Sequence, residues 1–427
     1  MNVISLYNIF LKNPSVSIDS RNISKDDIFF AIKGPNFDGN KFAMEALHNG
    51  ASFVISDNKK ISDRSDKIIY VNNSTKTLQN LANYHRKKLK TKIIAITGSN
   101  GKTTTKELLF NILKNNFKTI ATKGNLNNHL GVPLTLLSIS NETEIGIVEM
   151  GANHKKEIEF LCNLAEPDYG YITNFGKAHL EGFGSLEGVI QGKSELYDYL
   201  RDNNKLIFYD YSNSKQCSII GNYANKYSFG KSTNSNCIIN KIDNSSNISV
   251  EFKNKTISSS IYGDYNYQNI CASICISDYF KISIDFITKG IESYIPQNNR
   301  SEKLIQNSNE IILDAYNANP TSMELSINSF TKIKTKNKII IVGDMFELGI
   351  EAIGYHQLIV DQLEKIKNTK IYIIGSIFNQ TNFSKNIISF KLLKELIIHL
   401  KQQNFKNSTV LIKGSRGMEM ESIVDIF

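Results

Sequence analysis

The sequence predicts an α/β protein of three domains. Short apolar runs rich in Ile, Val and Phe recur along the chain with helical patterns between them, as in folds where strands alternate with helices. The length of 427 residues corresponds to about two to four domains of ordinary size. Hydrophobic residues make up 41% of the chain, which indicates packed cores and not a disordered polypeptide.

The first block, residues 1–88, is expected to form a small N-terminal α/β domain. Its expected strands are 27–32, 51–55 and 67–71, and its expected helices are 41–49 and 75–89. The second block, residues 89–294, opens with the continuous apolar run 92–97, which is typical of a buried parallel strand.

Further parts of this central block show the same kind of run. The expected parallel strands are 145–149, 169–173 and 205–209, and a helix is expected at 265–280. From 217 to 262 the pattern changes to short alternating segments, which predict a small antiparallel piece. The Asn- and Ser-rich stretches 211–216, 232–236 and 243–247 predict surface turns.

The third block, residues 295–427, begins near the Ile295-Pro296 pair. Its expected strands are 310–314, 338–343, 370–375 and 409–412, with helices between them. This alternation predicts a doubly wound, Rossmann-like C-terminal domain.

Charge and cysteine content exclude several partners and compartments. The formal net charge is +9, but the densest basic segment, residues 86–90, is short and has no zinc or RNA-binding motif beside it, so we expect no nucleic acid partner. Five cysteines without a CxxC pair suit a reducing compartment. No signal-peptide pattern and no run of about 18 apolar residues occurs. We therefore expect a cytoplasmic monomer without a membrane span.

A glycine-rich loop follows the strand 92–97 and precedes an expected helix at 104–113. It reads Gly98, Ser99, Asn100, Gly101, Lys102, Thr103. Glycines in this context let backbone N–H groups surround a phosphate at a helix N-terminus, while the lysine reaches the β- and γ-phosphates and the threonine holds Mg²⁺. The full motif has a glycine where this chain has Ile96. The loop predicts a nucleotide site of the P-loop kind, but kinases, GTPases, motors and ligases all use one.

Three residues further along the chain help to decide which reaction such a loop serves. Glu149 ends an expected strand, where it is either a second Mg²⁺ ligand or an exposed charge. His179 lies in a polar loop at another strand end and is a metal ligand, a base or a solvent-facing residue. Lys193 is expected at the start of a helix, where the dipole disfavours a cation unless the lysine binds an anion or is modified; otherwise it is a solvated lysine.

The loop and these three residues belong to a longer series of short motifs. In chain order the motifs are 97–105, 124–128, 131–135, 149–151, 173–183, 192–196, 263–269, 314–320, 343–349 and 413–417, preceded by 17–21, 27–34 and 38–39. Together they resemble the motifs of the Mur ligase family of peptidoglycan synthesis. The resemblance implies an N-terminal UDP-sugar-binding domain, a central ATPase domain and a C-terminal Rossmann-like ligase domain that closes over the nucleotide.

The strings 125–135, 316–320, 343–349 and 413–417 are most similar to those of family members that join D-alanyl-D-alanine to UDP-N-acetylmuramoyl-tripeptide. The implied activity is an ATP-dependent ligase that forms an acyl phosphate, then an amide, and releases ADP and phosphate. Alternatives are a member that adds meso-diaminopimelate or lysine, folylpolyglutamate synthase, and, in a different class, a nucleotide-gated binding protein without ligase chemistry.

The resemblance also implies residue roles. Lys102, His179 and Lys193 are the implied catalytic residues. ATP would contact residues 98–103, Thr104, Asn269, Arg300 and Asp314, and two Mg²⁺ ions would be held by Thr103, Glu149, His179 and Lys193. Substrates would contact Ser20, Arg21, Lys33, Asn127, Asn128, Tyr316, Asn317 and Asn319. In many members the lysine matching Lys193 is carbamylated, which implies that modification here. Tyr265 departs from the family's usual histidine.

Overall fold

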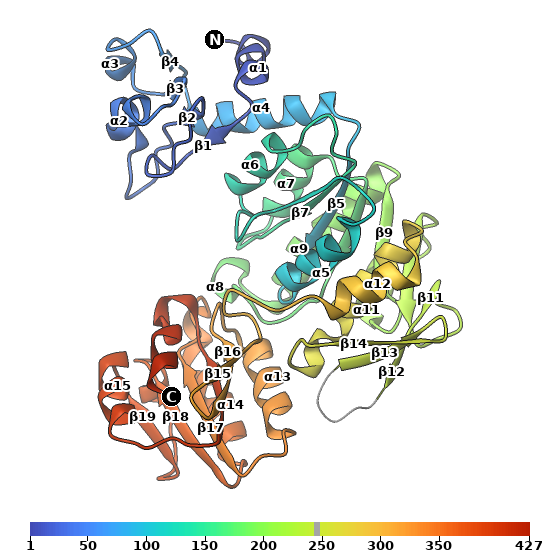
Figure 1. Ribbon diagram of the computed structural model, residues 1–427, viewed down its shortest axis with the longest axis vertical. Helices are drawn as coiled ribbons and strands as arrows, with labels where there is room; N and C mark the ends of the chain where they lie inside the picture. The colour runs from blue at the N-terminus through green and yellow to red at the C-terminus, as the bar shows by residue number, and fades with distance from the viewer. Residues whose placement is uncertain (243–247) are drawn as a thin grey trace.

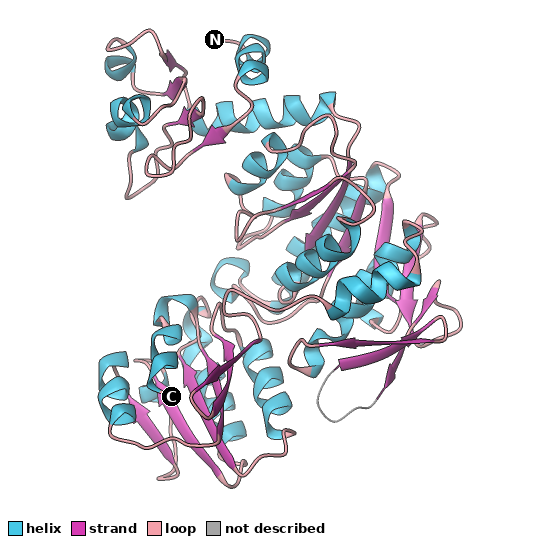
Figure 2. Ribbon diagram, viewed as in Figure 1, coloured by secondary structure: helices cyan, strands magenta, loops and turns pink. Residues whose placement is uncertain are grey.

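The structure, a computed structural model, describes residues 1–242 and 248–427; the turn expected at 243–247 lies outside the described residues. Figures 1 and 2 show three lobes, the N-terminal lobe at the top, the central lobe in the middle and the C-terminal lobe at the lower left. Each lobe has its own largely parallel sheet, which confirms the α/β class. The domain boundaries expected after residues 88 and 294 stay predictions.

The N-terminal lobe contains a four-stranded parallel sheet in the order β1-β2-β3-β4. Its strands are β1 (Val16–Ser17), β2 (Ile28–Phe30), β3 (Phe53–Ser56) and β4 (Ile68–Tyr70). Its helices are α1 (Val3–Lys12), η1 (Gly39–Phe42), α2 (Ala43–His48), α3 (Lys59–Ser62) and α4 (Ser74–Lys88).

The central lobe contains a seven-stranded parallel sheet in the order β11-β10-β9-β8-β5-β7-β6. The strands are β5 (Lys92–Thr97), β6 (Thr119–Ala121), β7 (Ile145–Glu149), β8 (Tyr169–Ile172), β9 (Leu206–Asp210), β10 (Lys226–Gly230) and β11 (Cys237–Ile238). The helices are α5 (Lys102–Leu113), α6 (Gly131–Leu137), α7 (Glu157–Ala165), α8 (Leu180–Phe183), α9 (Leu186–Asp202), α10 (Ser214–Ile220), η2 (Asp264–Asn266), α11 (Tyr267–Tyr279) and α12 (Ile284–Glu292).

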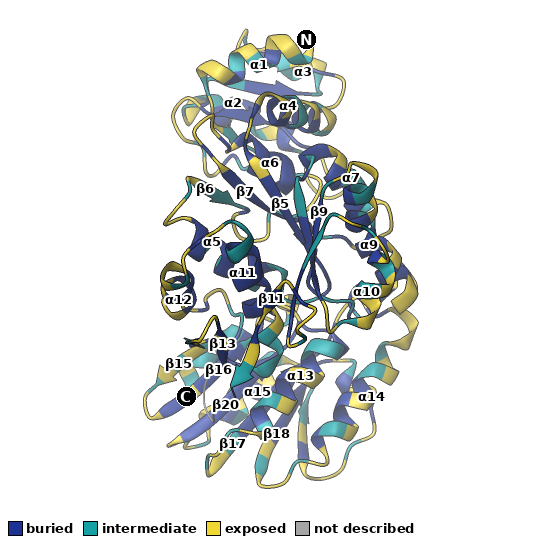
Figure 3. Cartoon of the chain, turned by 90° about the vertical axis from the view of Figure 1, so that its right-hand side faces the viewer, coloured by how far each residue is buried: buried dark blue, intermediate teal, exposed yellow. Residues whose placement is uncertain are grey.

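Helices cover both faces of this sheet, so its middle strands are buried (Figure 3). Along β5, Ile93 and Ala95 belong to one core cluster, whereas Ile94 and Ile96 belong to the other. Successive residues of a strand point to opposite faces of the sheet. Because both faces of β5 are buried, all of these residues are apolar and the strand appears in the sequence as a continuous apolar run.

The antiparallel piece is smaller than the sequence pattern indicates. It consists only of β12 (Asn240–Ile242), β13 (Ile248–Phe252) and β14 (Lys255–Ser259). The expected range 217–262 is therefore wrong at its start, because β10 and β11 extend the parallel sheet. The polar stretch 211–216 is also not only a turn, since α10 begins at Ser214 with Asn213 as its cap.

The C-terminal lobe has a six-stranded sheet in the order β15-β16-β20-β17-β18-β19, with only β15 antiparallel. The strands are β15 (Glu302–Gln306), β16 (Asn309–Asp314), β17 (Asn337–Gly343), β18 (Thr369–Ile374), β19 (Ile387–Phe390) and β20 (Ser408–Lys413). The helices are α13 (Pro320–Thr331), η3 (Gly349–Glu351), α14 (Ala352–Leu363), η4 (Phe378–Gln380), α15 (Leu393–Lys401), η5 (Arg416–Met418) and η6 (Met420–Ile426).

Helix α4 joins the N-terminal lobe to the central lobe through buried polar contacts. The Arg86 guanidinium donates to the carbonyl oxygens of Ala165 at 2.8 Å and Glu166 at 3.0 Å. His85 contributes a 2.7 Å contact from Nε2 to the carbonyl of Ile139. Within the described part of the chain, no helix is long and apolar enough to cross a membrane.

Candidate active site

The glycine-rich loop of residues 98–103, here called the phosphate loop, connects β5 to α5 at the carboxyl end of the central sheet. Gly98 and Gly101 have φ angles of +135° and +82°, which residues with a Cβ rarely adopt. A Cβ on Gly101 would also lie 2.4 Å from Oδ1 of Asn269, which is buried on α11. The glycines thus let the loop curl closely around the N-terminus of α5, as an anion-binding loop requires.

Lys102 points back along the loop. Its Nζ donates to the carbonyl oxygens of Gly98 at 2.6 Å and Ser99 at 3.3 Å. Burial lowers the pKa of Lys102, while the carboxylate of Glu149 acts in the opposite direction. The ammonium and the helix N-terminus therefore lie together, where both would attract phosphate oxygens.

Glu149, at the end of β7, faces the loop. Its Oε2 accepts a hydrogen bond from Oγ1 of Thr103 at 2.9 Å, and its Oε1 accepts one from Nδ2 of Asn127 at 2.7 Å. The residue is 1% exposed, so the reading of Glu149 as an exposed strand-end charge is wrong. The buried ammonium of Lys106 lies 4.0 Å from Oε2. The hydroxyl and carboxylate are the hard oxygen ligands that Mg²⁺ prefers, and the pair fits that ion.

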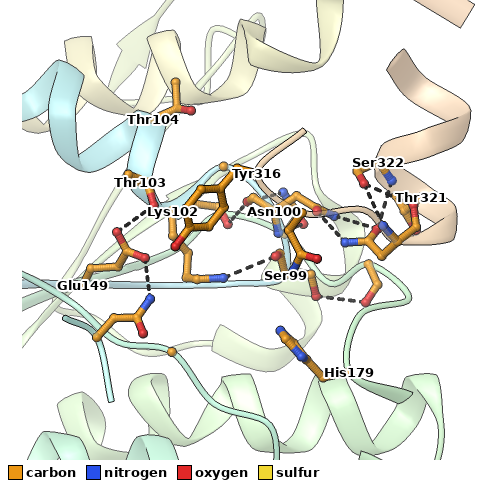
Figure 4. A pocket seen from close by; sticks show the side chains of 18 of the residues that line it. Ser99, Asn100, Lys102, Thr103, Thr104, Glu149, His179, Tyr316, Thr321 and Ser322 are labelled. Atoms are coloured by element: carbon orange, nitrogen blue, oxygen red, sulfur yellow. Dashed lines mark hydrogen bonds between the residues drawn. The ribbon is translucent and has the colours of Figure 1, made fainter. Parts of the chain in front are cut away.

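A cavity of about 1350 Å³ opens between the central and C-terminal lobes above this loop (Figure 4). It exceeds the volume of about 300–1,000 Å³ that suits one small ligand, so it has room for more than one. Of the predicted site residues it is lined by Ser99, Asn100, Gly101, Lys102, Thr103, Thr104, Asn127, Asn128, Glu149, His179, Asn269, Arg300, Asp314, Tyr316, Asn317 and Asn319.

Asp314 and Tyr265 meet where the chain passes between these two lobes. The Asp314 carboxylate accepts from Nζ of Lys413 at 2.7 Å and from the backbone N–H of Ser301 at 3.3 Å. The Tyr265 hydroxyl contacts Oγ of Ser301 at 2.8 Å and donates to Asp314 at 3.4 Å. Tyr265 thus connects the central lobe to Ser301, just before β15, and to Asp314 at the end of β16. Beside it, the Arg300 guanidinium stacks 3.5 Å above the ring centroid of Tyr316.

A reciprocal amide pair connects the phosphate loop to the C-terminal lobe. Nδ2 of Asn319 donates to Oδ1 of Asn100 at 2.7 Å, and Nδ2 of Asn100 lies 3.4 Å from Oδ1 of Asn319. Asn319 is also the N-cap of α13. Asn317 accepts from the backbone N–H of Ala318 at 2.9 Å. The residues expected near the incoming dipeptide therefore also shape the turn before α13, a structural role.

His179 lies on the cavity wall in a left-handed conformation, with φ +53°. Its Nδ1 lies against a carboxylate oxygen of Glu347 from the C-terminal lobe. Figure 4 shows its imidazole directed toward the phosphate loop. Among the described residues no group of three or more His, Cys, Asp or Glu side chains forms a metal cluster.

Lys193 is not at the start of a helix, because α9 begins at Leu186 after the N-cap Ser185. The prediction that the helix dipole disfavours a cation at Lys193 is therefore wrong. Lys193 is instead 1% exposed, and its Nζ donates to the carbonyl of Ala152 at 2.9 Å. Burial, then the charge of Lys102, lowers its pKa well below the ordinary value. The reading as a solvated lysine is also wrong. Lys193 lies behind the cavity wall, which Ala152 lines.

The residues expected to bind a UDP-sugar lie apart from this cavity. Ser20, Arg21 and Lys33 are not among its lining residues. The Arg21 side chain is 83% exposed and pairs with Asp19 at 2.8 Å. Asn128 lines the cavity, but its Oδ1 accepts from the backbone N–H groups at the start of α6, at 3.0 and 2.9 Å.

Sequence reasoning missed several residues of the site. Glu347 and Lys413 lie in the motifs 343–349 and 413–417, but the sequence assigns them no role, and Lys106 lies one residue beyond the motif 97–105. Lys106 lies one turn after Thr103 on α5, and this spacing puts both on one face. This spacing is visible in the sequence, whereas the Glu347–His179 contact joins segments far apart in the chain and has no local sequence signal.

Comparison with known proteins identifies relatives over most of the chain. Family models match residues 14–93 (Mur ligase family, catalytic domain), 96–277 (Mur ligase middle domain) and 299–416 (Mur ligase, glutamate ligase domain). The chain is 35% identical to the UDP-N-acetylmuramoyl-tripeptide–D-alanyl-D-alanine ligase of Rickettsia prowazekii, over 96% of this chain and 94% of that protein.

Two further relatives are similar over nearly their full lengths. The corresponding ligase of Bacillus subtilis is 31% identical over 96% of this chain and 92% of that protein. A crystal structure of the MurF ligase of Thermotoga maritima in complex with ADP has a TM-score of 0.85 at 28% identity, covering 98% of this chain and 97% of that one.

Proposed function

The chain belongs to the Mur ligase family, and on this premise we propose that it joins D-alanyl-D-alanine to UDP-N-acetylmuramoyl-tripeptide at the expense of ATP. The observation that carries the proposal is the 35% identity to a ligase of that name over 96% of the chain. The cavity between the phosphate loop and the C-terminal lobe supports it, because a three-substrate ligase needs one chamber for nucleotide, acid and amine.

The reaction has two steps. A carboxylate oxygen of the tripeptide attacks the γ-phosphorus of ATP, and the bond to the β-phosphate breaks to give an acyl phosphate and ADP. The amine of the dipeptide then attacks the acyl carbon, loses a proton and displaces phosphate. Carboxylate and triphosphate repel each other, so positive charge must lie between them. Lys102 and the N-terminus of α5 supply it.

We propose that Thr103 and Glu149 hold one Mg²⁺ and that His179 and Lys193 serve a second. When bound, Mg²⁺ neutralises charge that develops on the transferring phosphoryl group. Lys193 as an ammonium would not suit a cation. Its burial favours the neutral amine, the form that reacts with carbon dioxide, and the resulting carbamate is an anion. The Lys193→Ala variant should be nearly inactive and partly restored by short carboxylic acids; undiminished activity would overturn this role.

The remaining substrate contacts are proposed by position. Asn269, Arg300 and Asp314 would contact the adenosine side of ATP, while Tyr316, Asn317 and Asn319 lie on the side where the amine enters. Ser20, Arg21 and Lys33 would hold the UDP group on the N-terminal lobe. Arginine and lysine suit a diphosphate. We propose a monomer that works in the cytoplasm.

A phosphate-release assay tests the activity. Protein, ATP and Mg²⁺ are combined with UDP-N-acetylmuramoyl-tripeptide and with D-alanyl-D-alanine, lysine, meso-diaminopimelate or glutamate in turn. Release that requires both the tripeptide and D-alanyl-D-alanine is the expected result. Release with a UDP-muramoyl dipeptide and a diamino acid would indicate the preceding step, and release with a folate and glutamate would indicate the folate enzyme. ATP binding without release in any mixture would favour a nucleotide-gated binding protein.

A further inference from the structure

The contact between His179 and Glu347 joins two lobes at the edge of the cavity. His179 precedes α8 of the central lobe, and Glu347 precedes η3 of the C-terminal lobe. Besides the side-chain pair, the backbone N–H of Glu181 donates to the carbonyl of Glu347 at 3.1 Å. The contact is thus held by both backbone and side chains.

Both paired residues have left-handed backbones, φ +53° at His179 and +63° at Glu347. For residues with a Cβ this conformation is costly and persists where the surroundings determine it, often at functional sites. On the Glu347 side, Phe346 donates its N–H to Oγ of Ser415 at 2.9 Å, and Asp344 accepts from Phe378 N–H at 2.9 Å. The segment that presents Glu347 is therefore braced from two sides, unlike a chance surface pair.

The pairing has a consequence for the imidazole. A neutral histidine carries one N–H and one acceptor nitrogen. A carboxylate beside Nδ1 favours the proton on Nδ1, which leaves the Nε2 lone pair free. Figure 4 shows the ring of His179 directed toward the phosphate loop, and within the described residues no hydrogen bond or ion pair engages Nε2.

We propose that Glu347 is a positioning residue that sets the tautomer and direction of His179, so that the second Mg²⁺ position is complete only when the C-terminal lobe is closed. The inference rests on the proposed function, in which His179 is a metal ligand. Histidines that bind metals commonly donate their other N–H to a carboxylate, and loss of that partner weakens binding by about 10–100-fold. Here the partner comes from a different lobe, the C-terminal one.

Mn²⁺ is the probe, since its free concentration is read by electron paramagnetic resonance without turnover. The full-length protein is titrated in the presence of ADP and of UDP-N-acetylmuramoyl-tripeptide. Glu347→Ala should lose one Mn²⁺ site or bind it about tenfold more weakly, with the Thr103–Glu149 site unchanged. Glu347→Gln, which keeps an acceptor oxygen, should lose less. Glu324→Gln removes a charge from an exposed position of α13 and should match the unchanged protein.

A second measurement separates positioning from folding. Nitrogen-15 spectra of histidine-labelled protein, with His179 assigned by its loss in His179→Gln, should show an Nδ1–H tautomer that shifts toward Nε2–H in Glu347→Ala. Equal Mn²⁺ binding and an unchanged tautomer in a folded Glu347→Ala variant would overturn the inference. If the unchanged protein itself shows no dipeptide-dependent phosphate release, the proposed function fails instead, so the two failures are distinguishable.

Discussion

Replacing Gly101 by alanine tests how closely the phosphate loop is fitted to α11. Gly184 is the matched control, because it also has a left-handed backbone, φ +78° against +82° at Gly101, but nothing lies within 4 Å of an added Cβ. Both substitutions carry the cost of a left-handed alanine, about 1 kcal/mol. Only at Gly101 does the methyl group meet Asn269, at 2.4 Å.

Asn269 cannot move freely, since Oδ1 accepts from Thr105 at 3.2 Å and Nδ2 donates to Asn266 at 2.8 Å. Displacing it breaks both hydrogen bonds, at about 1 kcal/mol each. The Gly101→Ala variant should therefore lose about 2 kcal/mol more stability than Gly184→Ala, or about 4–8 °C in Tm.

Thermal unfolding followed by circular dichroism measures Tm, and titration with a fluorescent ADP analogue measures nucleotide affinity. Because the methyl group pushes the loop away from its phosphate-binding shape, nucleotide affinity should fall by at least about tenfold in Gly101→Ala and stay unchanged in Gly184→Ala. Equal losses of Tm and equal affinities in the two variants would refute the reasoning.

Three further predictions follow from buried polar contacts. Burial lowers the pKa of His85 from 6.5; because the unfolded chain then binds the proton more readily than the folded one, stability should be complete above about pH 6.5 and decline below it. Urea unfolding at about pH 7.5 and about pH 5.5 should show this decline, and His85→Phe, but not His48→Phe, should flatten it. Lys106→Met removes a buried ammonium that donates to the carbonyl of Thr122 at 2.6 Å and lies 4.0 Å from the carboxylate of Glu149, and it should cost about 3 kcal/mol, measured by urea unfolding. A loss like that of a surface lysine variant would contradict a buried role for this ammonium. Tyr265→Phe removes the hydroxyl 2.8 Å from Ser301; it should raise the KM for ATP about fivefold and lower Tm by about 2–4 °C. A lower Tm with an unchanged KM would make Tyr265 only a packing residue.

The phosphate loop could be predicted because its signal is local. β5 has the bounds expected from its apolar run, Lys92–Thr97, and the neighbouring strand brings Glu149 opposite Ile96. Strand, loop and helix lie within a few residues of one another. The proximity of Thr103 and Glu149 could therefore be inferred from the motif and the position of the next strand end, while their role in holding Mg²⁺ stays a prediction.

Lys193 shows why other parts could not be predicted. The sequence predicts a helix start beside Gly192 and Lys193, yet Gly188 and Gly192 both lie inside α9. A Cβ on Gly192 would be 2.4 Å from the ring of Phe183, and one on Gly188 would be 2.0 Å from the carbonyl of Phe183. These glycines permit close packing of α8 against α9, which a single sequence cannot distinguish from a helix end.

The segment after β9 shows a second limit. The short alternating pattern of residues 226–238 predicts antiparallel strands, but β11 runs parallel to β10. The connection between them is held by the backbone N–H of Ser228, which donates to Oδ1 of Asn236 at 2.9 Å. The His179–Glu347 contact is a third case, because it depends on the placement of one lobe against another.

The contacts of α4 also bear on the order in which the chain folds during synthesis. Arg86 is 8% exposed, and its guanidinium is satisfied by carbonyl groups 79 and 80 residues further along. When the ribosome has made only the first sheet, those acceptors have not yet been synthesised, and a buried guanidinium without partners is costly. The guanidinium therefore stays in water at this stage, and the last turn of α4 can dock against the central lobe only after α7 has been synthesised. A chain that stops at residue 88 would present this turn, and the apolar side chains beside it, to solvent and to chaperones.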